Sequence, residues 1–321
     1  MRNECKIIAM SDIAAEEVRW LWYPYIPYGK VTIIQGDPGE GKTSFVLAMI
    51  ALLTRGEPLP EEAAGGEPVN VIYQSAEDGL ADTIKPRLER SGADCSKVLV
   101  IDESQKDLTL CDARLEQAIL ETGARLIVLD PMQAYLGDQV DMHRANEIRP
   151  MFKRLCRMAE RTGCAVILIG HMNKAQGLKA SYRGLGSIDF RAAARSVLLV
   201  GRMKDSPDIR VVAHDKSSLA PEGRSIAFAL DAENGFQWKG FCDTTVNELL
   251  AGEGTVQTKT MRMEEALKTM LTKPVSVEEV FRRAKELGIS ERTVNIAKKN
   301  LGVGSVKSGN QWYWTAPGAR M

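Results

Sequence analysis

The stretch Gly36-Asp37-Pro38-Gly39-Glu40-Gly41-Lys42-Thr43 decides the fold, because it reads G-x-x-x-x-G-K-T, the pattern of a phosphate-cradling loop. The preceding run, residues 31–35, is short and β-branched, as a buried strand is. The following run, residues 44–54, is apolar and rich in Ala, Leu and Met, as a helix is. The motif therefore has the strand, loop and helix context that a phosphate-binding loop requires.

Each residue type in this loop has a physical role. Its glycines let the backbone curl around a phosphate, and its N–H groups and the helix N-terminus form an anion-binding nest. Lys42 would place its charge on the β- and γ-phosphates, and Thr43 would offer its hydroxyl to Mg²⁺. A chance Gly-rich turn is the alternative, and the flanking elements argue against it. The predicted nucleotide-binding residues are Gly36, Asp37, Pro38, Gly39, Glu40, Gly41, Lys42, Thr43 and Ser44.

Length and charge suggest two parts. A chain of 321 residues fits two domains, or one large domain with an appendage. The formal net charge is zero, yet from Val256 onward there are twelve Lys/Arg against six Asp/Glu, which leaves 30 against 36 in the remainder. A basic C-terminal piece on a mildly acidic body suggests that the tail meets a polyanion, although a solvated charged face would have the same composition.

The cysteines and the N-terminus exclude some classes. The six cysteines at positions 5, 95, 111, 156, 164 and 242 form no C-x-x-C pair or Cys/His cluster, so no zinc site is expected. The first ten residues lack the apolar core of a signal peptide, and no run approaches the length of a membrane span. The simplest interpretation is a cytoplasmic protein with reduced thiols and no membrane partner.

Acidic residues follow two further strands. Residues 69–74 read as a strand that runs into Ser75-Ala76-Glu77-Asp78-Gly79, and residues 125–130 read as a strand that ends in Asp130. Ligands of open α/β sheets collect at the carboxyl ends of strands. We therefore expect Asp130 to hold Mg²⁺, directly or through water, although an Asp-Pro pair also commonly ends a strand in a turn.

The remaining pattern predicts an α/β fold with a mostly parallel, twisted sheet covered by helices on both faces. Residues 164–170 read as a strand that ends at His171, and residues 196–201, 209–214 and 225–230 read as further strands. The aromatic stretch at residues 20–30 could stack a base, but we favour packing beside the first strand.

A small helical unit follows a polar connector at residues 241–260. Residues 262–271 read as a helix, Ser276 opens a second helix and Ser290 caps a third at residues 291–301. With a hairpin at residues 303–314 this is the pattern of a winged helix-turn-helix domain, predicted over residues 261–321. The exposed face of the third helix would present Arg292, Asn295, Lys298 and Lys299 to duplex DNA, although such domains also dock proteins.

With these motifs placed, the chain resembles the RecA/DnaB-type hexameric ATPases, and within them the RepA-like ATPases of plasmids, phages and prophages. The resemblance covers about residues 15–240 and rests on GDPGEGKTS, SAED, LIVLDP, LIGHMNK, YRGLGSIDFRAAARSV and HDKSSLAPEG. It implies a RecA-like P-loop NTPase core at residues 31–240 after a lead-in at residues 1–30, the cofactors ATP and Mg²⁺, and a homo-hexamer. The tail, with GISERTVNIAKKNLGV and NQWYW, resembles the winged-helix end that often follows such cores.

The resemblance also implies roles for single residues. Glu77 matches the glutamate that orients and deprotonates the attacking water, and Asp130 matches the Walker B acid. His171 matches a γ-phosphate sensor, whereas Arg195 and Lys216 match cations that reach a neighbouring subunit's ATP. The implied catalytic set is Lys42, Glu77, His171, Arg195 and Lys216. Ser218 departs from the pattern, because DnaB-like members often carry a second basic residue there.

The loops after the predicted strands at residues 125–130 and 164–170 correspond to the DNA-facing loops of a ring. Their cations would follow a single-stranded phosphate backbone with little sequence preference; they are Arg144, Lys174, Lys179 and Arg183. The resemblance thus implies a ring-forming replicative helicase or ATPase that acts on single-stranded DNA. An ATP-switched DNA- or protein-binding module without helicase activity is the alternative, and a filament-forming recombinase would use the same core.

Overall fold

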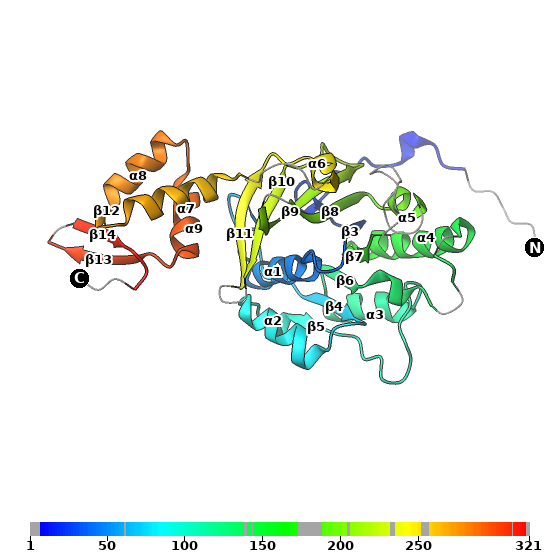
Figure 1. Ribbon diagram of the computed structural model, residues 1–321. Helices are drawn as coiled ribbons and strands as arrows, with labels where there is room; N and C mark the ends of the chain where they lie inside the picture. The colour runs from blue at the N-terminus through cyan, green and yellow to red at the C-terminus, as the bar shows by residue number, and fades with distance from the viewer. Residues whose placement is uncertain are drawn as a thin grey trace, which may run out of the picture.

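The computed structural model describes residues 7–60, 62–137, 140–142, 144–172, 188–203, 206–231, 235–251, 257–309 and 311–318. Within these ranges a nine-stranded sheet forms the centre, in the order β11-β10-β9-β8-β3-β7-β6-β4-β5 (Figure 1). A smaller unit lies to one side, beyond β11 (Figure 1). The predicted α/β fold with a mostly parallel sheet is confirmed.

The sheet has a parallel part and an antiparallel part. The parallel strands are β8 (Ser196–Met203), β3 (Val31–Gly36), β7 (Ala165–His171), β6 (Leu126–Asp130), β4 (Val71–Ser75) and β5 (Val98–Leu99). The antiparallel strands are β9 (Ser206–Ser217), β10 (Ser225–Asp231) and β11 (Gly235–Cys242). Since parallel strands point the same way, the residues that follow β3, β4, β6 and β7 gather at one edge, here called the carboxyl edge.

Helices cover both faces of the sheet. One face carries α1 (Lys42–Arg55) and α2 (Lys85–Arg90), and the other carries α3 (Ala113–Thr122), α4 (Ala145–Thr162) and α5 (Ile188–Ala193). The strands alternate accordingly: in β6, Val128 packs in the cluster that contains α1 and Ile127 in the one that contains α4. Short helical turns are η1 (Met10–Asp12), η2 (Leu80–Ile84), η3 (Cys95–Lys97) and η4 (Met132–Tyr135).

The aromatic lead-in packs against the core. It forms a small hairpin of β1 (Trp20–Trp22) and β2 (Ile26–Pro27). Trp22 and Tyr25 are buried, with their ring centroids 4.7 Å apart, and Trp22 lies 6.2 Å from Phe45 of α1. The preference for packing over base stacking is confirmed at these two residues.

The smaller unit, here called the C-terminal unit (residues 259–315), has its own apolar core. It comprises α7 (Lys259–Met270), β12 (Val275–Ser276), α8 (Val277–Glu286), α9 (Glu291–Asn300), β13 (Gly304–Ser308) and β14 (Gln311–Thr315). Ser276 Oγ accepts from the Glu279 N–H, and Ser290 Oγ accepts from the Thr293 N–H, each at 3.3 Å. Both predicted helix caps are therefore confirmed.

Among the described residues between 188 and 251, three elements escape the sequence pattern. The region predicted as a connector holds the end of β11 and a helix, α6 (Val246–Ala251), and α5 occupies a stretch where no element was expected. In β11 the charged Lys239 is buried against Glu264 of the C-terminal unit, so the strand lacks an apolar alternation. The sequence pattern did not predict this strand, because the partner that permits burial of Lys239 lies in another unit. No described helix combines the length and the apolar character needed to cross a bilayer.

Candidate active site

The loop between β3 and α1 owes its shape to its glycines. A Cβ on Gly36 would lie 2.2 Å from the carbonyl oxygen of Val200, so only glycine lets β3 approach β8 this closely. Gly41 has φ +88°, and a Cβ there would also lie 2.7 Å from Leu230 Cδ1. The loop therefore curls back tightly onto the N-terminus of α1, as the motif predicts.

Lys42 turns into this loop. Its Nζ donates to the carbonyl oxygens of Gly36 and Asp37, both at 2.9 Å, and lies 3.3 Å from His171 Nδ1. Burial lowers the pKa of Lys42, an effect that nearby carboxylates, Asp130 first, oppose. The ammonium is thus held where the loop curls, ready to exchange carbonyl acceptors for phosphate oxygens.

Asp130 is the buried acid of the site. The Thr43 hydroxyl and the Tyr73 hydroxyl both donate to its Oδ2 atom, each at 2.7 Å. Burial raises the pKa of the Asp130 carboxyl, and the two hydrogen bonds act in the opposite direction. The two residues expected to hold Mg²⁺, Thr43 and Asp130, are therefore in contact. Tyr73 was not predicted, because a tyrosine inside a buried strand gives no sign of its partner until the strands are paired.

Glu77 and His171 face each other across the mouth of the site. Glu77 follows β4 with its side chain 65% exposed, and its Oε2 lies 3.6 Å from His171 Nε2 at the end of β7. A cavity of about 250 Å³ joins these groups. Its lining is Gly39, Gly41, Lys42, Thr43, Ser44, Ser75, Glu77, Asp78, Arg87, Asp130, His171 and Leu230. The exposed carboxylate can meet water at the cavity mouth, as a general base requires.

Further charged residues frame the loop. Arg87 of α2 pairs with Asp78 at 3.0 Å, and Arg202 of β8 pairs with Glu40 of the loop at 3.0 Å. These arginines were not predicted, because they belong to elements that only the sheet order brings beside the loop. Their ion pairs hold Asp78 and Glu40 in place around the cavity.

Arg195 and Lys216 lie at the opposite edge of the sheet, here called the amino edge. The Arg195 N–H donates to the Val31 carbonyl at the start of β3, and its side chain is exposed. Lys216 pairs with Val197 at the start of β8. Its ammonium donates to the carbonyls of Arg191, Ala192 and Ala194, at 2.7, 3.2 and 2.9 Å. At about 3.3 Å per strand residue, β3 separates this edge from the phosphate loop by roughly 17 Å.

The predicted DNA contacts are dispersed. Arg144 is exposed and pairs with Asp141 at 3.3 Å and Glu147 at 3.4 Å. Lys174, Lys179 and Arg183 lie outside the described residues. The structure therefore leaves the predicted DNA loops untested.

The four residues expected on the exposed face of α9 have different surroundings in the structure. Arg292 donates to the carbonyls of Leu59 and Glu62 in the larger unit, which contains the central sheet. Lys298 instead donates to Ser305 Oγ at 2.6 Å and lies 4.5 Å from the Trp314 ring centroid. Asn295 and Lys299 are exposed. Arg292 is also exposed, and its guanidinium in addition bonds to the larger unit, whereas its proposed contact with DNA stays a prediction.

The arrangement suits Mg²⁺ better than a protein-held metal. Among the described residues no group of three or more His, Cys, Asp or Glu side chains could hold a metal ion. Mg²⁺ at nucleotides typically takes one or two protein oxygens and completes its shell with phosphates and water. One buried carboxylate beside one hydroxyl, Asp130 and Thr43, matches that donor set.

The fold and the site define a class: a P-loop ATPase with a RecA-like core. The chain belongs to the AAA domain family AAA_25, whose profile matches residues 7–177. It is 27% identical to the DNA repair protein RadA of Halalkalibacterium halodurans over 148 residues, which are 46% of this chain and 28% of that protein. RadA of Brucella abortus is 27% identical over 152 residues, with 46% and 29% covered. The chain thus spans under a third of these curated relatives.

A solved structure supports the same architecture. That structure, an ATPase domain, superposes with a TM-score of 0.50 at 16% sequence identity, over 66% of this chain and 84% of that one. At this identity the likeness concerns the fold alone. The likeness agrees with the sheet described above, whereas the chemistry is inferred from the residues of the site.

Proposed function

We propose that the protein is a Mg²⁺-dependent ATPase that assembles as a homo-hexameric ring and acts on single-stranded DNA. The convergence of Lys42, Thr43, Asp130 and Glu77 around one cavity at the carboxyl edge carries the proposal. Lys42 binds the phosphates, and Thr43 with Asp130 holds Mg²⁺, which supplies charge neutralisation when bound. Glu77 orients and deprotonates the attacking water, and His171 links Glu77 to Lys42.

The amino edge supports assembly. Arg195 and Lys216 lie roughly 17 Å of strand away from their own phosphate loop, so they cannot stabilise charge on their own nucleotide. In a ring, the amino edge of one subunit meets the carboxyl edge of the next. The two cations then complete the neighbouring site, where an arginine can be worth about 10³-fold in rate.

The partner follows from charge and from relatives. The RadA proteins that match this chain are DNA repair proteins by name, and acting on DNA is proposed here for this chain as well. Arg144, Lys174, Lys179 and Arg183 then track the backbone of a single strand in the ring. Residues 261–321 act as a winged helix-turn-helix domain that contacts duplex DNA.

A subunit-mixing experiment tests the ring. ATP hydrolysis is measured against protein concentration, with and without single-stranded DNA, for Lys42→Ala, for Arg195→Ala and for their mixture. Each variant alone is expected to be inactive, whereas the mixture is expected to regain activity. In the mixture, Arg195 of a Lys42→Ala subunit can reach the intact phosphate loop of a neighbouring Arg195→Ala subunit. A mixture as inactive as its components would refute completion of the site in trans.

A second function is an ATP-switched binding module, favoured by the contact of Arg292 with the ATPase body. In this case ATP governs whether the C-terminal unit is available to DNA or protein. Slow hydrolysis with constant specific activity at all concentrations, unaffected by single strands, would favour the module. Cooperative, DNA-stimulated hydrolysis would favour the ring.

A further inference from the structure

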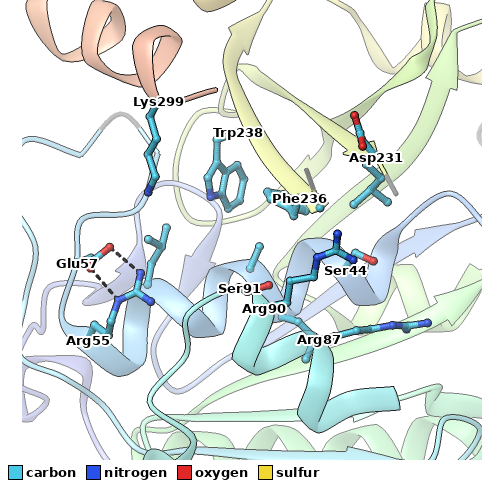
Figure 2. A pocket seen from close by; sticks show the side chains of 15 residues that line it. Ser44, Arg55, Glu57, Arg87, Arg90, Ser91, Asp231, Phe236, Trp238 and Lys299 are labelled. Carbon is cyan, nitrogen blue, oxygen red and sulfur yellow. Dashed lines mark hydrogen bonds and ion pairs between the residues drawn. The ribbon is translucent and has the colours of Figure 1, made fainter. Parts of the chain in front are cut away.

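A second cleft adjoins the phosphate cavity and is walled partly by the C-terminal unit. It has a volume of about 580 Å³ and shares Ser44, Arg87 and Leu230 with the smaller cavity, so the two lie side by side. Its walls come from α1, α2, the β10–β11 hairpin and α9 (Figure 2). At about 1.5 Å per helical residue, the wall from Ser44 to Arg55 is roughly 16 Å long. A nucleotide anchored on the phosphate loop therefore has this cleft as its neighbouring free volume.

Lys299 lines the far end of the cleft. This side chain extends from α9 toward Glu57, which is held by Arg55 through bonds of 2.7 and 2.8 Å (Figure 2). The Arg55 hydrogen bond lowers the pKa of Glu57, and the charge of Lys299 adds to this effect. Lys298, one residue earlier, packs on Trp314 within its own unit. The two adjacent lysines therefore face different surfaces: Lys298 faces Trp314 of its own unit, and Lys299 faces the cleft.

Buried polar contacts hold α9 in this position. Lys239 of β11 donates to both carboxylate oxygens of Glu264 of α7 at 2.9 Å, with the two side chains only 9% and 10% exposed. Asn300 of α9 donates to the same carboxylate at 2.7 Å and to the Trp238 carbonyl of β11 at 3.4 Å. Removing one partner of a buried ion pair leaves the other charge uncompensated. The contact between β11 and the helices α7 and α9 therefore depends on these particular residues.

The same hairpin touches the phosphate loop. Leu230 at the end of β10 lies beside Gly41, and Phe228 stacks on Phe236 with 4.9 Å between ring centroids. Phe236 in turn packs on Trp238 at 4.7 Å. One packed element therefore contacts the phosphate loop at one end and, through the Trp238 carbonyl, α9 at the other, so a contiguous path of contacts joins the two.

We propose that the C-terminal unit completes the nucleotide cleft of its own subunit, so that its docking through α7 and α9 and nucleotide binding favour each other. This inference rests on the proposed nucleotide-binding function. A docked unit supplies the Lys299 wall and holds the β10–β11 hairpin against the loop. Because linkage is reciprocal, bound nucleotide strengthens the docking by the same factor. The position of the C-terminal unit thereby depends on whether nucleotide is bound, and this would change how the unit contacts duplex DNA.

Affinity for ADP with Mg²⁺, measured by titration calorimetry on the full chain, tests the linkage. Lys299→Ala is expected to weaken binding about threefold, since one partly exposed charge is lost. Glu264→Lys sets a second ammonium against Lys239, forces undocking and is expected to weaken binding about fivefold or more. Lys307→Ala, an exposed lysine of the same unit on β13, is the matched control and is expected to bind as wild type.

A second readout keeps the test decisive. Hydrogen exchange in α9 is expected to slow when ADP binds to the wild type and to stay fast in Glu264→Lys. Asn300→Ala replaces Glu264→Lys if the latter fails to fold. Wild-type affinity in folded Lys299→Ala and in an undocked variant would overturn the linkage. Retained ADP affinity in Lys42→Ala would instead refute the phosphate site, so the two failures are distinguishable.

Discussion

The two edges of the central sheet differ in how their functional side chains are held. At the carboxyl edge, Lys42 is bound to the carbonyls of the loop, and Thr43 is bound to Asp130, by short hydrogen bonds. At the amino edge, Arg195 is exposed and Lys216 bonds to backbone carbonyls of α5. The first edge is organised within one chain, whereas at the second the Arg195 side chain faces outward and Lys216 is held by the backbone of its own chain. This difference fits the proposal that each chain carries one complete phosphate loop and supplies cations to the nucleotide site of a neighbouring subunit.

The largest expected effect lies at the amino edge. Arg195→Ala should lower ATP turnover about 10³-fold at protein concentrations that favour assembly, because a cation at the transferring phosphate is lost. ADP affinity of the isolated chain should stay unchanged, since Arg195 lies far from its own loop. Steady-state hydrolysis and calorimetry measure the two quantities. Normal turnover would make the two edges independent and contradict the ring.

At the carboxyl edge, Glu77→Gln should keep nucleotide affinity and lower turnover at least about 100-fold, because the general base is removed without loss of shape. His171 Nε2 lies 3.6 Å from Glu77 Oε2, so His171 also loses its contact with a carboxylate. Single-turnover kinetics with Mg²⁺ and ATP provide the measurement, and Glu67→Gln, on an exposed loop, is the control. Turnover close to wild type would remove Glu77 from the mechanism.

The amino edge should also be the more acid-sensitive of the two. Burial lowers the pKa of His214 to about 4 from the usual value near 6.5. Its ring bonds to Ser196 Oγ at 3.0 Å, and its Nδ1 accepts from the Gly223 N–H at 2.9 Å. The unfolded chain therefore binds a proton first as the pH falls. About 3 kcal/mol of folding free energy should be lost between pH 6.5 and 4.

Urea unfolding at several pH values measures this loss. The variant His214→Gln, which can keep both hydrogen bonds and does not titrate, should flatten the dependence over the same window. An equal pH slope in both proteins would show that another group governs acid stability.

The smallest expected effect concerns Lys216. Lys216→Met keeps the aliphatic stem but removes three hydrogen bonds to the end of α5, and should cost about 1–2 kcal/mol of stability. Because Lys216 is also proposed to complete a neighbour's nucleotide site, turnover should fall by more than the loss of stability explains. Thermal unfolding and hydrolysis on the same samples separate the two roles. Lost stability with normal turnover would leave Lys216 purely structural.

The sequence by itself determined the phosphate loop, the strand and helix around it, and the acids that follow β4 and β6. Local chemistry is sufficient there: Gly41 needs a positive φ, Lys42 follows it directly, and Asp130 ends a strand of buried residues. The helix caps at Ser276 and Ser290 were also predictable, because each serine hydroxyl and the backbone N–H that donates to it lie three residues apart.

Tertiary structure alone decided the rest. Tyr73 on Asp130, Lys239 with Glu264, and Arg292 on the 59–62 loop join residues that are 57, 25 and 230 or more positions apart. A buried charge or hydroxyl is tolerated only where its partner is supplied, and nothing local states which partner that is. The phosphate site was therefore predictable from a contiguous motif, whereas the joint between the ATPase body and the C-terminal unit emerged only when the sheet order brought β11 against α7 and α9.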